Sequence, residues 1–188
     1  PLVYAANWDS YRNVGWWDAL DFIGIDAYFP LTSQLDPTAG DLLSAWNSRA
    51  EQIEAWLASL PPKERKPVLF TEIGYRSLDG ANKAPYAWSE YTTMNVDLQE
   101  QADCYRAAFE GTWDRPWMAG YDWWNWETNP LAGIDPDTGL PLNDYTPQNK
   151  PAVDVLRARY IPEPSSVVLL CLGLAAGFAR TLNRRAED

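Results

Sequence analysis

The sequence contains no histidine, two cysteines and two methionines in 188 residues. Without histidine, neither a Ser-His-Asp nor a Cys-His catalytic arrangement is available, and no zinc site can use imidazole ligands. Cys104 falls in a helical pattern and Cys171 in an apolar tail, so we expect two separate buried thiols rather than a disulfide or a metal site. The candidate acids and bases are carboxylates, tyrosines, lysines and cysteines, and no metal or organic cofactor is implied.

Positive charge is also scarce. The 15 Lys and Arg residues face 26 Asp and Glu residues, which gives a net charge of -11 and a pI near 4.4. This balance argues against nucleic acid or an anionic surface as the partner of the protein body and favours a neutral ligand. The sequence starts at Pro1 with neither an initiator methionine nor a signal peptide. We therefore expect that an N-terminal portion is missing.

Aromatic residues are abundant, with 11 tryptophans and 10 tyrosines. They serve well as core residues, but their position beside Asn and Asp favours surfaces that stack on sugar rings. Two arrangements remain open at this point, a sugar-binding surface and simple core packing.

Apolar periodicity alternates along the chain between strand and helix patterns. It predicts strands within 2–8, 21–30, 66–76 and 117–127, and helices over 41–60, 97–113 and 150–160. This order is typical of parallel β/α units, which carry their sites at the carboxyl ends of the strands. Four such units are about half of an eight-stranded barrel of about 250 residues. We expect an α/β fold: a partial (β/α)8 TIM barrel over 1–160.

The stretch 66–76 is central to this prediction. An apolar run after Pro67 ends in one carboxylate, Glu72, followed by Gly74. Strict alternation of side chains places Val68, Phe70 and Glu72 on one face of the strand. Glu72 is either a functional group at a strand end or an ordinary solvated glutamate.

The tail, residues 161–188, differs from the rest of the chain. Pro162-Glu163-Pro164-Ser165-Ser166 precedes an apolar run that ends in several arginines. An apolar run of this length fits either a core helix or a marginal membrane span, and the arginines favour the membrane. The order of these parts resembles the PEP-CTERM sorting tail of exported bacterial proteins. That resemblance implies export, transient membrane anchoring by this apolar helix, and processing by an exosortase-like enzyme.

Three segments together resemble the TIM-barrel glycoside hydrolases of the family 113 β-mannanase type. They are Asp21-Phe22-Ile23-Gly24-Ile25-Asp26-Ala27-Tyr28-Phe29-Pro30, the stretch 66–76, and Trp123-Trp124-Asn125-Trp126. The resemblance covers about residues 2–160 and would correspond to strands five to eight of the barrel. It implies that Glu72 is the nucleophile of a retaining enzyme and that Tyr28 hydrogen-bonds and orients it. The aromatic floor under the sugar would be Trp124 or Trp126.

The chemistry of retaining hydrolysis independently requires a nucleophilic carboxylate, a second carboxyl group, and surfaces that hold a pyranose ring. Candidate substrate-binding residues for a polysaccharide or oligosaccharide are Asn7, Trp8, Asp26, Trp88, Trp124, Asn125 and Trp126. Asp26 is equally well explained as a structural hydrogen-bonding group, and Trp123 as core.

The acid/base carboxylate follows strand four in such enzymes, and the sequence shows no matching Asn-Glu motif. Two other hypotheses therefore stay open: a non-catalytic carbohydrate-binding cell-surface protein, and an inactive truncated product.

Overall fold

A computed structural model describes residues 1–87 and 95–160. It divides the chain into two compact units, residues 1–156 and 157–188, and the first contains the sheet. The expected sorting tail at 161–188 and the candidate Trp88 lie outside the described residues. In the described part of the chain, no helix is both long enough and apolar enough to cross a membrane.

The observed elements follow the predicted order. The strands are β1 (Val3–Asn7), β2 (Phe22–Asp26), β3 (Val68–Ile73) and β4 (Met118–Trp123), and the helices are α1 (Ala39–Ser59), α2 (Leu98–Thr112) and α3 (Ala152–Tyr160). Between β1 and β2 the chain makes only short 3-10 turns, η1 (Tyr11–Asn13) and η2 (Trp17–Ala19). A third turn, η3 (Pro62–Glu64), links α1 to the approach to β3.

The two long helices begin at side-chain caps. Thr38 and Asp41 form a reciprocal capping box at the start of α1, and the Asp97 carboxylate accepts from the backbone N–H of Glu100 at the start of α2. These caps satisfy backbone donors that a helix leaves free in its first turn. Helix α1 ends just before the two prolines at 61–62, as the sequence predicts.

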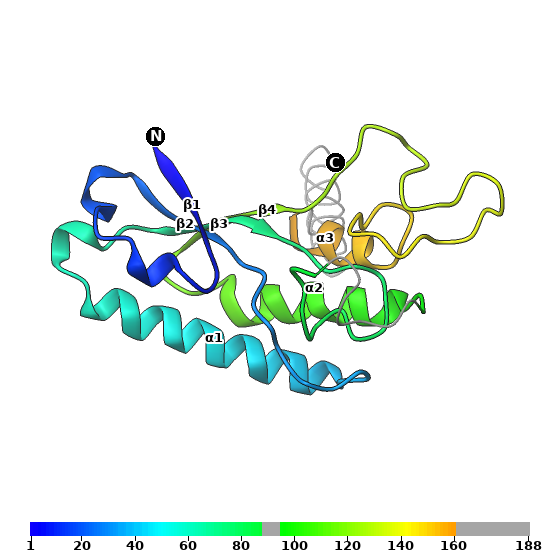
Figure 1. The fold of residues 1–188 in the computed structure, drawn as a ribbon, viewed down its shortest axis with the longest axis horizontal. Helices are drawn as coiled ribbons and strands as arrows, with labels where there is room; N and C mark the ends of the chain where they lie inside the picture. The colour runs from blue at the N-terminus through cyan, green and yellow to red at the C-terminus, as the bar shows by residue number, and fades with distance from the viewer. Residues whose placement is uncertain (88–94, 161–188) are drawn as a thin grey trace, which may run out of the picture. The chain divides into compact units, whose positions relative to one another are not determined.

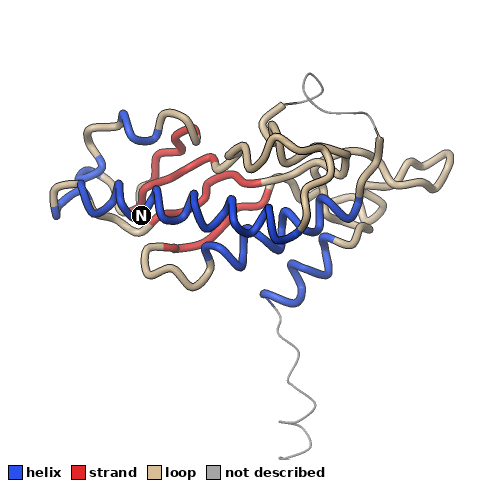
Figure 2. The backbone as a smooth tube through the Cα atoms, turned by 90° about the horizontal axis from the view of Figure 1, so that it is seen from below, coloured by secondary structure: helices blue, strands red, loops and turns tan. Residues whose placement is uncertain are grey.

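The four strands form one parallel sheet in the order β1-β2-β3-β4. Helices α1 and α2 lie side by side against one face of this sheet, as both views show (Figure 1, Figure 2). The outer strands β1 and β4 each have a single neighbour in the described sheet, and Val3 and Tyr4 on β1 are both 44% exposed. The expected partial barrel, with unpaired strand edges and exposed apolar residues, is confirmed.

Aromatic side chains fill the layer between sheet and helices. Trp46 of α1 contacts Phe70 of β3 with ring centroids 5.8 Å apart, and Trp123 of β4 stacks on Tyr105 of α2 at 4.1 Å. All four side chains are largely removed from water, and Trp46, Phe70 and Tyr105 are fully buried. Many of the aromatic residues therefore pack the core, while others line the strand ends described below.

The expected side-chain alternation is wrong at the end of β3. Phe70 pairs with Ile25, but the next register pair is Asp26 with Glu72. The strand β3 therefore has one extra residue, Thr71, between two consecutive pairs with β2. Glu72 therefore shares a face with Asp26, and not with Phe70, which is buried against the helices. A bulge of this kind re-aims a side chain at the end of a strand.

Candidate active site

Polar side chains from three adjacent strands meet at the carboxyl edge of the sheet. Asn7 of β1 pairs in register with Asp26 of β2, and Asp26 pairs with Glu72 of β3. The following backbone is held in line, because Ala27 N–H donates to the Glu72 carbonyl at 2.6 Å. The edge thus presents two carboxylates and one amide in a row, at the end of the strands where parallel α/β folds carry their sites.

Glu72 is held by Tyr28. The Tyr28 hydroxyl donates a hydrogen bond of 3.0 Å to Glu72 Oε2, and both side chains are half-buried. Burial, together with the nearby Glu72 charge, raises the pKa of Tyr28 well above 10. The phenol therefore keeps its proton at neutral pH, so it donates to the carboxylate and does not repel it.

Asp26 is fixed by the strand beside it. Thr71, which directly precedes Glu72 in the sequence, donates a hydrogen bond of 2.9 Å from its hydroxyl to Asp26 Oδ1. Burial raises the pKa of Asp26, and the Thr71 hydrogen bond opposes that shift. Asp26 keeps a second carboxylate oxygen that can accept from a ligand hydroxyl.

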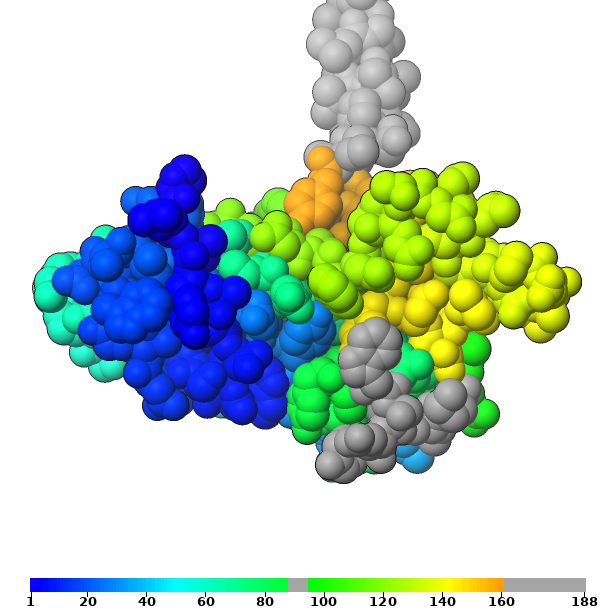
Figure 3. Space-filling model, turned by 45° about the horizontal axis from the view of Figure 1, so that its top comes forward, coloured from blue at the N-terminus to red at the C-terminus, as the bar shows by residue number. Residues whose placement is uncertain are grey.

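The connection after β4 carries exposed aromatic rings. Trp124 is 43% exposed and Trp126 is 63% exposed, in contrast to the core residue Trp123. Figure 3 shows this connection, residues 124–145, as a projecting lobe in yellow-green and yellow. Large exposed aromatic faces are available there for stacking.

Gly74 lets the strand ends approach closely. A Cβ at this position would lie 2.2 Å from the carbonyl oxygen of Trp124, and the Trp124 N–H donates to the Ile73 carbonyl at 2.8 Å. The Trp124–Asn125 peptide bond is cis. Asn125 Nδ2 lies 3.5 Å from Glu127 Oε1, where Glu127 is exposed and Asn125 is half-buried. Trp124 is therefore held next to the residues that follow Glu72.

A second aromatic surface joins two loops. Trp8, directly after β1, stacks on Tyr86 of the β3–α2 loop with centroids 5.5 Å apart and planes 18° apart. Tyr86 is 46% exposed. The sequence analysis named Trp88 of this loop as a candidate but did not single out Tyr86. The signal was present, since Tyr86 and Trp88 are aromatic residues in one polar loop.

A buried cluster of polar side chains, the polar hub, joins the loops after β2 and β3. Glu100, 4% exposed in the first turn of α2, accepts from Gly80 N–H at 2.8 Å and from the backbone and side-chain N–H groups of Asn82, both at 2.9 Å. Asn82 Oδ1 in turn accepts from the backbone N–H of Thr32 at 3.1 Å and from its hydroxyl at 2.7 Å. The loops after β2 and β3 therefore share one anchor. This hub could not be predicted from the sequence, because its members lie far apart in the chain.

Metal-binding groups do not gather in the described residues, where no cluster of three or more Cys, Asp or Glu side chains could hold an ion. The chemistry of the strand edge rests on carboxylates, a phenol, amides and aromatic faces. Carboxylates at the carboxyl ends of the strands of a parallel β/α barrel are a common arrangement in retaining glycoside hydrolases.

Comparisons with known proteins identify the family. Residues 1–145 match the model of Glycoside Hydrolase Family 113, and residues 161–185 match the PEP-CTERM protein-sorting motif. The chain belongs to glycoside hydrolase family 113. Its sorting motif indicates exosortase-dependent sorting to the cell surface. Among curated proteins, none matches the chain significantly.

Solved structures agree with this family. A GH113 β-1,4-mannanase is 30% identical with a TM-score of 0.65, over 86% of this chain and 45% of that one. The GH113 β-mannanase of Alicyclobacillus acidocaldarius in complex with ManMIm is 28% identical with a TM-score of 0.63, over 83% of this chain and 44% of that one. A Faecalibacterium prausnitzii β-glucuronidase, 17% identical with a TM-score of 0.54 over 88% and 26% of the two chains, shares the fold alone. The chain thus spans less than half the length of these mannanases.

Proposed function

We propose that this chain carries the nucleophile-bearing half of a retaining glycoside hydrolase that acts on β-linked polysaccharide, of the endo-β-mannanase type. The observation that supports this most directly is the hydrogen bond from Tyr28 to Glu72 at the carboxyl edge of the sheet. Family membership and the similarity to solved β-mannanases support mannan as the substrate class.

In the proposed reaction, a Glu72 carboxylate oxygen attacks the anomeric carbon, and the bond from that carbon to the leaving oxygen breaks. The leaving oxygen takes a proton from a second carboxyl group about 5 to 5.5 Å from the nucleophile. Tyr28 keeps Glu72 aimed, since its hydroxyl donates a hydrogen bond to one carboxylate oxygen and so fixes the orientation of the other. Neither Asp26 nor Glu127 is proposed as this proton donor, because the family resemblance implies that the donor follows strand four of the barrel.

The sugar would be held by stacking and by hydroxyl contacts. Trp124 and Trp126 offer exposed faces after β4, and Trp8 with its stacked partner Tyr86 offers another after β1. Amide and carboxylate groups suit sugar hydroxyls, which both donate and accept. The residues proposed for hydroxyl contacts are Asn7, Asp26 and Asn125, and Trp88 remains a further proposed stacking residue.

We also propose that the tail, residues 161–188, anchors the protein transiently in a bacterial membrane during export, and that an exosortase-like enzyme processes it. The match to the sorting motif over 161–185 supports this proposal.

Trapping the covalent intermediate tests the role of Glu72 without requiring a proton donor. The probe is a dinitrophenyl β-mannoside with fluorine in place of the hydroxyl next to the anomeric carbon. Dinitrophenolate leaves without protonation, and the fluorine slows hydrolysis of the glycosyl-enzyme. We expect one fluoromannosyl group on a peptide containing Glu72, detected by mass spectrometry.

Three variants sharpen this experiment. Glu72→Gln should abolish labelling, whereas the matched control Glu51→Gln, an exposed acid on α1, should label as the wild type does. Tyr28→Phe removes a hydrogen bond to a charged group, which is worth about 1.5–3 kcal/mol, so labelling should slow by about tenfold to a hundredfold. The same set is run after co-expression with the part of a family 113 β-mannanase that lies outside the match. Labelling at another carboxylate, or labelling that survives Glu72→Gln, would refute the assignment.

A carbohydrate-binding protein without catalysis is the second candidate, favoured by the exposed Trp124 and Trp126. It predicts retention on insoluble mannan that Glu72→Gln leaves unchanged, with no reducing ends released by the co-expressed protein. Release of reducing ends that depends on Glu72 would exclude it.

A further inference from the structure

Tyr145, in the long connection between β4 and α3, packs against the tyrosine that holds Glu72. Its ring meets the Tyr28 ring in a T-shaped contact, with centroids 6.3 Å apart and planes 77° apart. Aromatic pairs favour this edge-to-face geometry. Tyr145 is only 6% exposed, whereas Tyr28 is half-buried, so Tyr145 is the deeper ring of the pair.

Hydrogen bonds fix Tyr145 at both ends of the residue. Its hydroxyl donates to the carbonyl of Pro85 in the β3–α2 loop. Its own carbonyl accepts from Gln101 Nε2 at 3.3 Å and from the Tyr105 hydroxyl at 3.5 Å, and both donors are fully buried on α2. The Tyr145 ring therefore cannot turn without breaking a hydrogen bond at a buried site, which is costly.

The same ring lies against the backbone that follows Glu72. A Cβ on Gly74, two residues after Glu72, would lie 3.3 Å from Tyr145 Cδ1. The carbonyl of the preceding residue, Asp144, accepts from the Ser77 N–H at 2.9 Å. The segment that carries Tyr145 is thus bound to the chain just beyond β3, and its ring is placed relative to the strand that presents Glu72.

We propose that Tyr145 is a positioning residue of the candidate active site: its ring fixes the orientation of the Tyr28 ring, and Tyr28 in turn aims Glu72. A half-buried tyrosine can rotate about its side-chain bonds, and contact with a fixed ring restricts that rotation. Tyr145 takes no part in the reaction itself, since its hydroxyl donates to Pro85. The inference rests on the proposed role of Glu72 as nucleophile.

The test follows the Glu72 carboxylate carbon by NMR at neutral pH, in the full chain labelled with ¹³C at the glutamate side-chain carboxyl groups. The resonance is assigned from its loss in Glu72→Gln. Tyr28→Phe removes the hydrogen bond to the carboxylate and should move this resonance. Tyr145→Leu, which removes the supporting ring, should move it in the same direction by a smaller amount. Tyr145→Phe keeps the ring and should leave the resonance near its wild-type position.

A double-mutant cycle shows whether Tyr145 acts through Tyr28. In the Tyr28→Phe background, Tyr145→Leu should cause no further shift of the Glu72 resonance, because the hydrogen bond through which Tyr145 acts is already absent. A direct effect of the Tyr145 ring on the carboxylate would persist in that background. The proposal is overturned if Tyr145→Leu shifts the resonance equally in both backgrounds, or if it does not shift the resonance at all.

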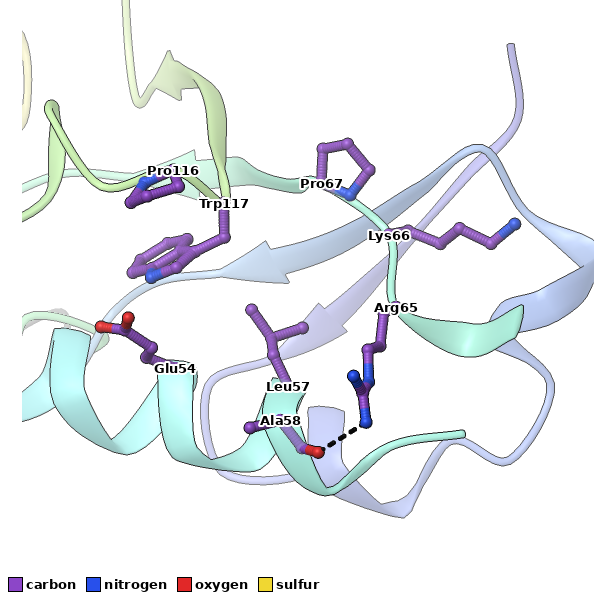
Figure 4. Close-up of a pocket in the computed structure, with 8 residues that line it drawn as sticks. All are labelled: Glu54, Leu57, Ala58, Arg65, Lys66, Pro67, Pro116 and Trp117. Atoms are coloured by element: carbon purple, nitrogen blue, oxygen red, sulfur yellow. Dashed lines mark hydrogen bonds between the residues drawn. The ribbon is translucent and has the colours of Figure 1, made fainter. Parts of the chain in front are cut away.

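The matched control removes a buried aromatic ring at the opposite end of the same strands. Trp117 is 9% exposed, its ring lies 6.4 Å from that of Phe70 between centroids, and it lines a pocket of about 340 Å³ between α1 and the segments that lead into β3 and β4 (Figure 4). Trp117→Leu enlarges this pocket and should lower stability, but it should leave the Glu72 resonance in place. If it moves that resonance as Tyr145→Leu does, the effect is a general loosening of the fold and the proposal is wrong.

Labelling with the fluoromannoside gives a second measurement. At saturating probe, Tyr145→Leu should slow labelling of Glu72 by about threefold to tenfold, with the half-saturating concentration unchanged, and Tyr145→Phe should restore the wild-type rate. A change confined to the half-saturating concentration would overturn the proposal. If the wild type is not labelled, the proposed function of Glu72 fails, while the carbon resonance still decides whether Tyr145 positions Tyr28. Tyr145→Met replaces Tyr145→Leu in every comparison if the leucine variant does not fold.

Discussion

Replacing Glu100 by alanine should destabilise the chain strongly. The Glu100 carboxylate accepts three hydrogen bonds, one from Gly80 N–H and two from Asn82, and both acceptor and donors are buried. Glu100→Ala leaves these three donors without their acceptor at a buried site. A buried donor in this state costs about 1–3 kcal/mol.

The sum for three donors would reach about 9 kcal/mol at most, but water entering the vacated space recovers part of it. We therefore expect a loss of about 3–5 kcal/mol in the free energy of unfolding, which is a large fraction of the total stability of a typical domain. Glu100→Gln keeps one acceptor oxygen and turns an amide NH₂ toward a donor. It should cost about 1–3 kcal/mol, as expected for one unsatisfied group.

The assay is urea unfolding of the chain at neutral pH, followed by tryptophan fluorescence and analysed by linear extrapolation. Glu110→Ala is the matched control, because Glu110 is an exposed acid on the same helix and its loss should change stability by less than about 0.5 kcal/mol. If Glu100→Ala and Glu110→Ala unfold within about 1 kcal/mol of each other, the hub does not stabilise the fold as argued.

Three further predictions concern the glycine beside Trp124, the buried tyrosines and the thiol of Cys104. Gly74→Ala should cost about 1–3 kcal/mol in urea unfolding, since the new Cβ would meet the Trp124 carbonyl at 2.2 Å, while Gly15→Ala, with nothing within 4 Å, should be nearly neutral; equal effects would contradict the close approach. Burial raises the pKa of four tyrosines, to about 12 for Tyr145, so the folded chain holds these protons more tightly than the unfolded chain does. The other three are Tyr28, Tyr75 and Tyr105. Stability should therefore be constant with respect to these groups below pH 10 and fall between pH 10 and 12 by about 5 kcal/mol per pH unit, or about 1.4 for each tyrosine. The lowered pKa of Lys150 makes stability rise with pH below pH 10.5, by at most about 1.4 kcal/mol per pH unit, and so offsets a small part of the fall. Tyrosinate absorbance that rises before unfolding would contradict the prediction. In a Cys171→Ser variant, Cys104 should resist thiol reagents until the chain unfolds, because it is fully buried and burial raises the pKa of its thiol; rapid native-state modification would show that α2 opens locally.

The order of strands and helices was accessible from the sequence because apolar spacing and proline positions are local signals. Helix α1 carries its apolar residues at three- and four-residue intervals and stops at Pro61, and the structure follows both. The four strands likewise end where the residues turn polar or aromatic. The partial barrel could therefore be predicted, together with the strand that presents Glu72.

The facing of Glu72 could not be predicted in the same way. Alternation within one strand assumes an unbroken register, whereas β2 and β3 slip past one another between Ile25 and Asp26. A slip depends on the neighbouring strand, which a single stretch of sequence does not contain. The hub at Glu100 could not be predicted for a related reason, since Thr32, Asn82 and Glu100 are brought together only by the fold.

The shared anchor at Asn82 also makes the two connections around the candidate site behave as a unit. The N–H groups of Leu31 and Thr32 donate to Asn82, and those of Gly80 and Asn82 donate to Glu100. Because all four N–H groups bind to Asn82 or Glu100, and Asn82 itself binds Glu100, we expect hydrogen exchange to report one common opening event for both connections. A ligand that orders either connection would then slow exchange in the other without touching it.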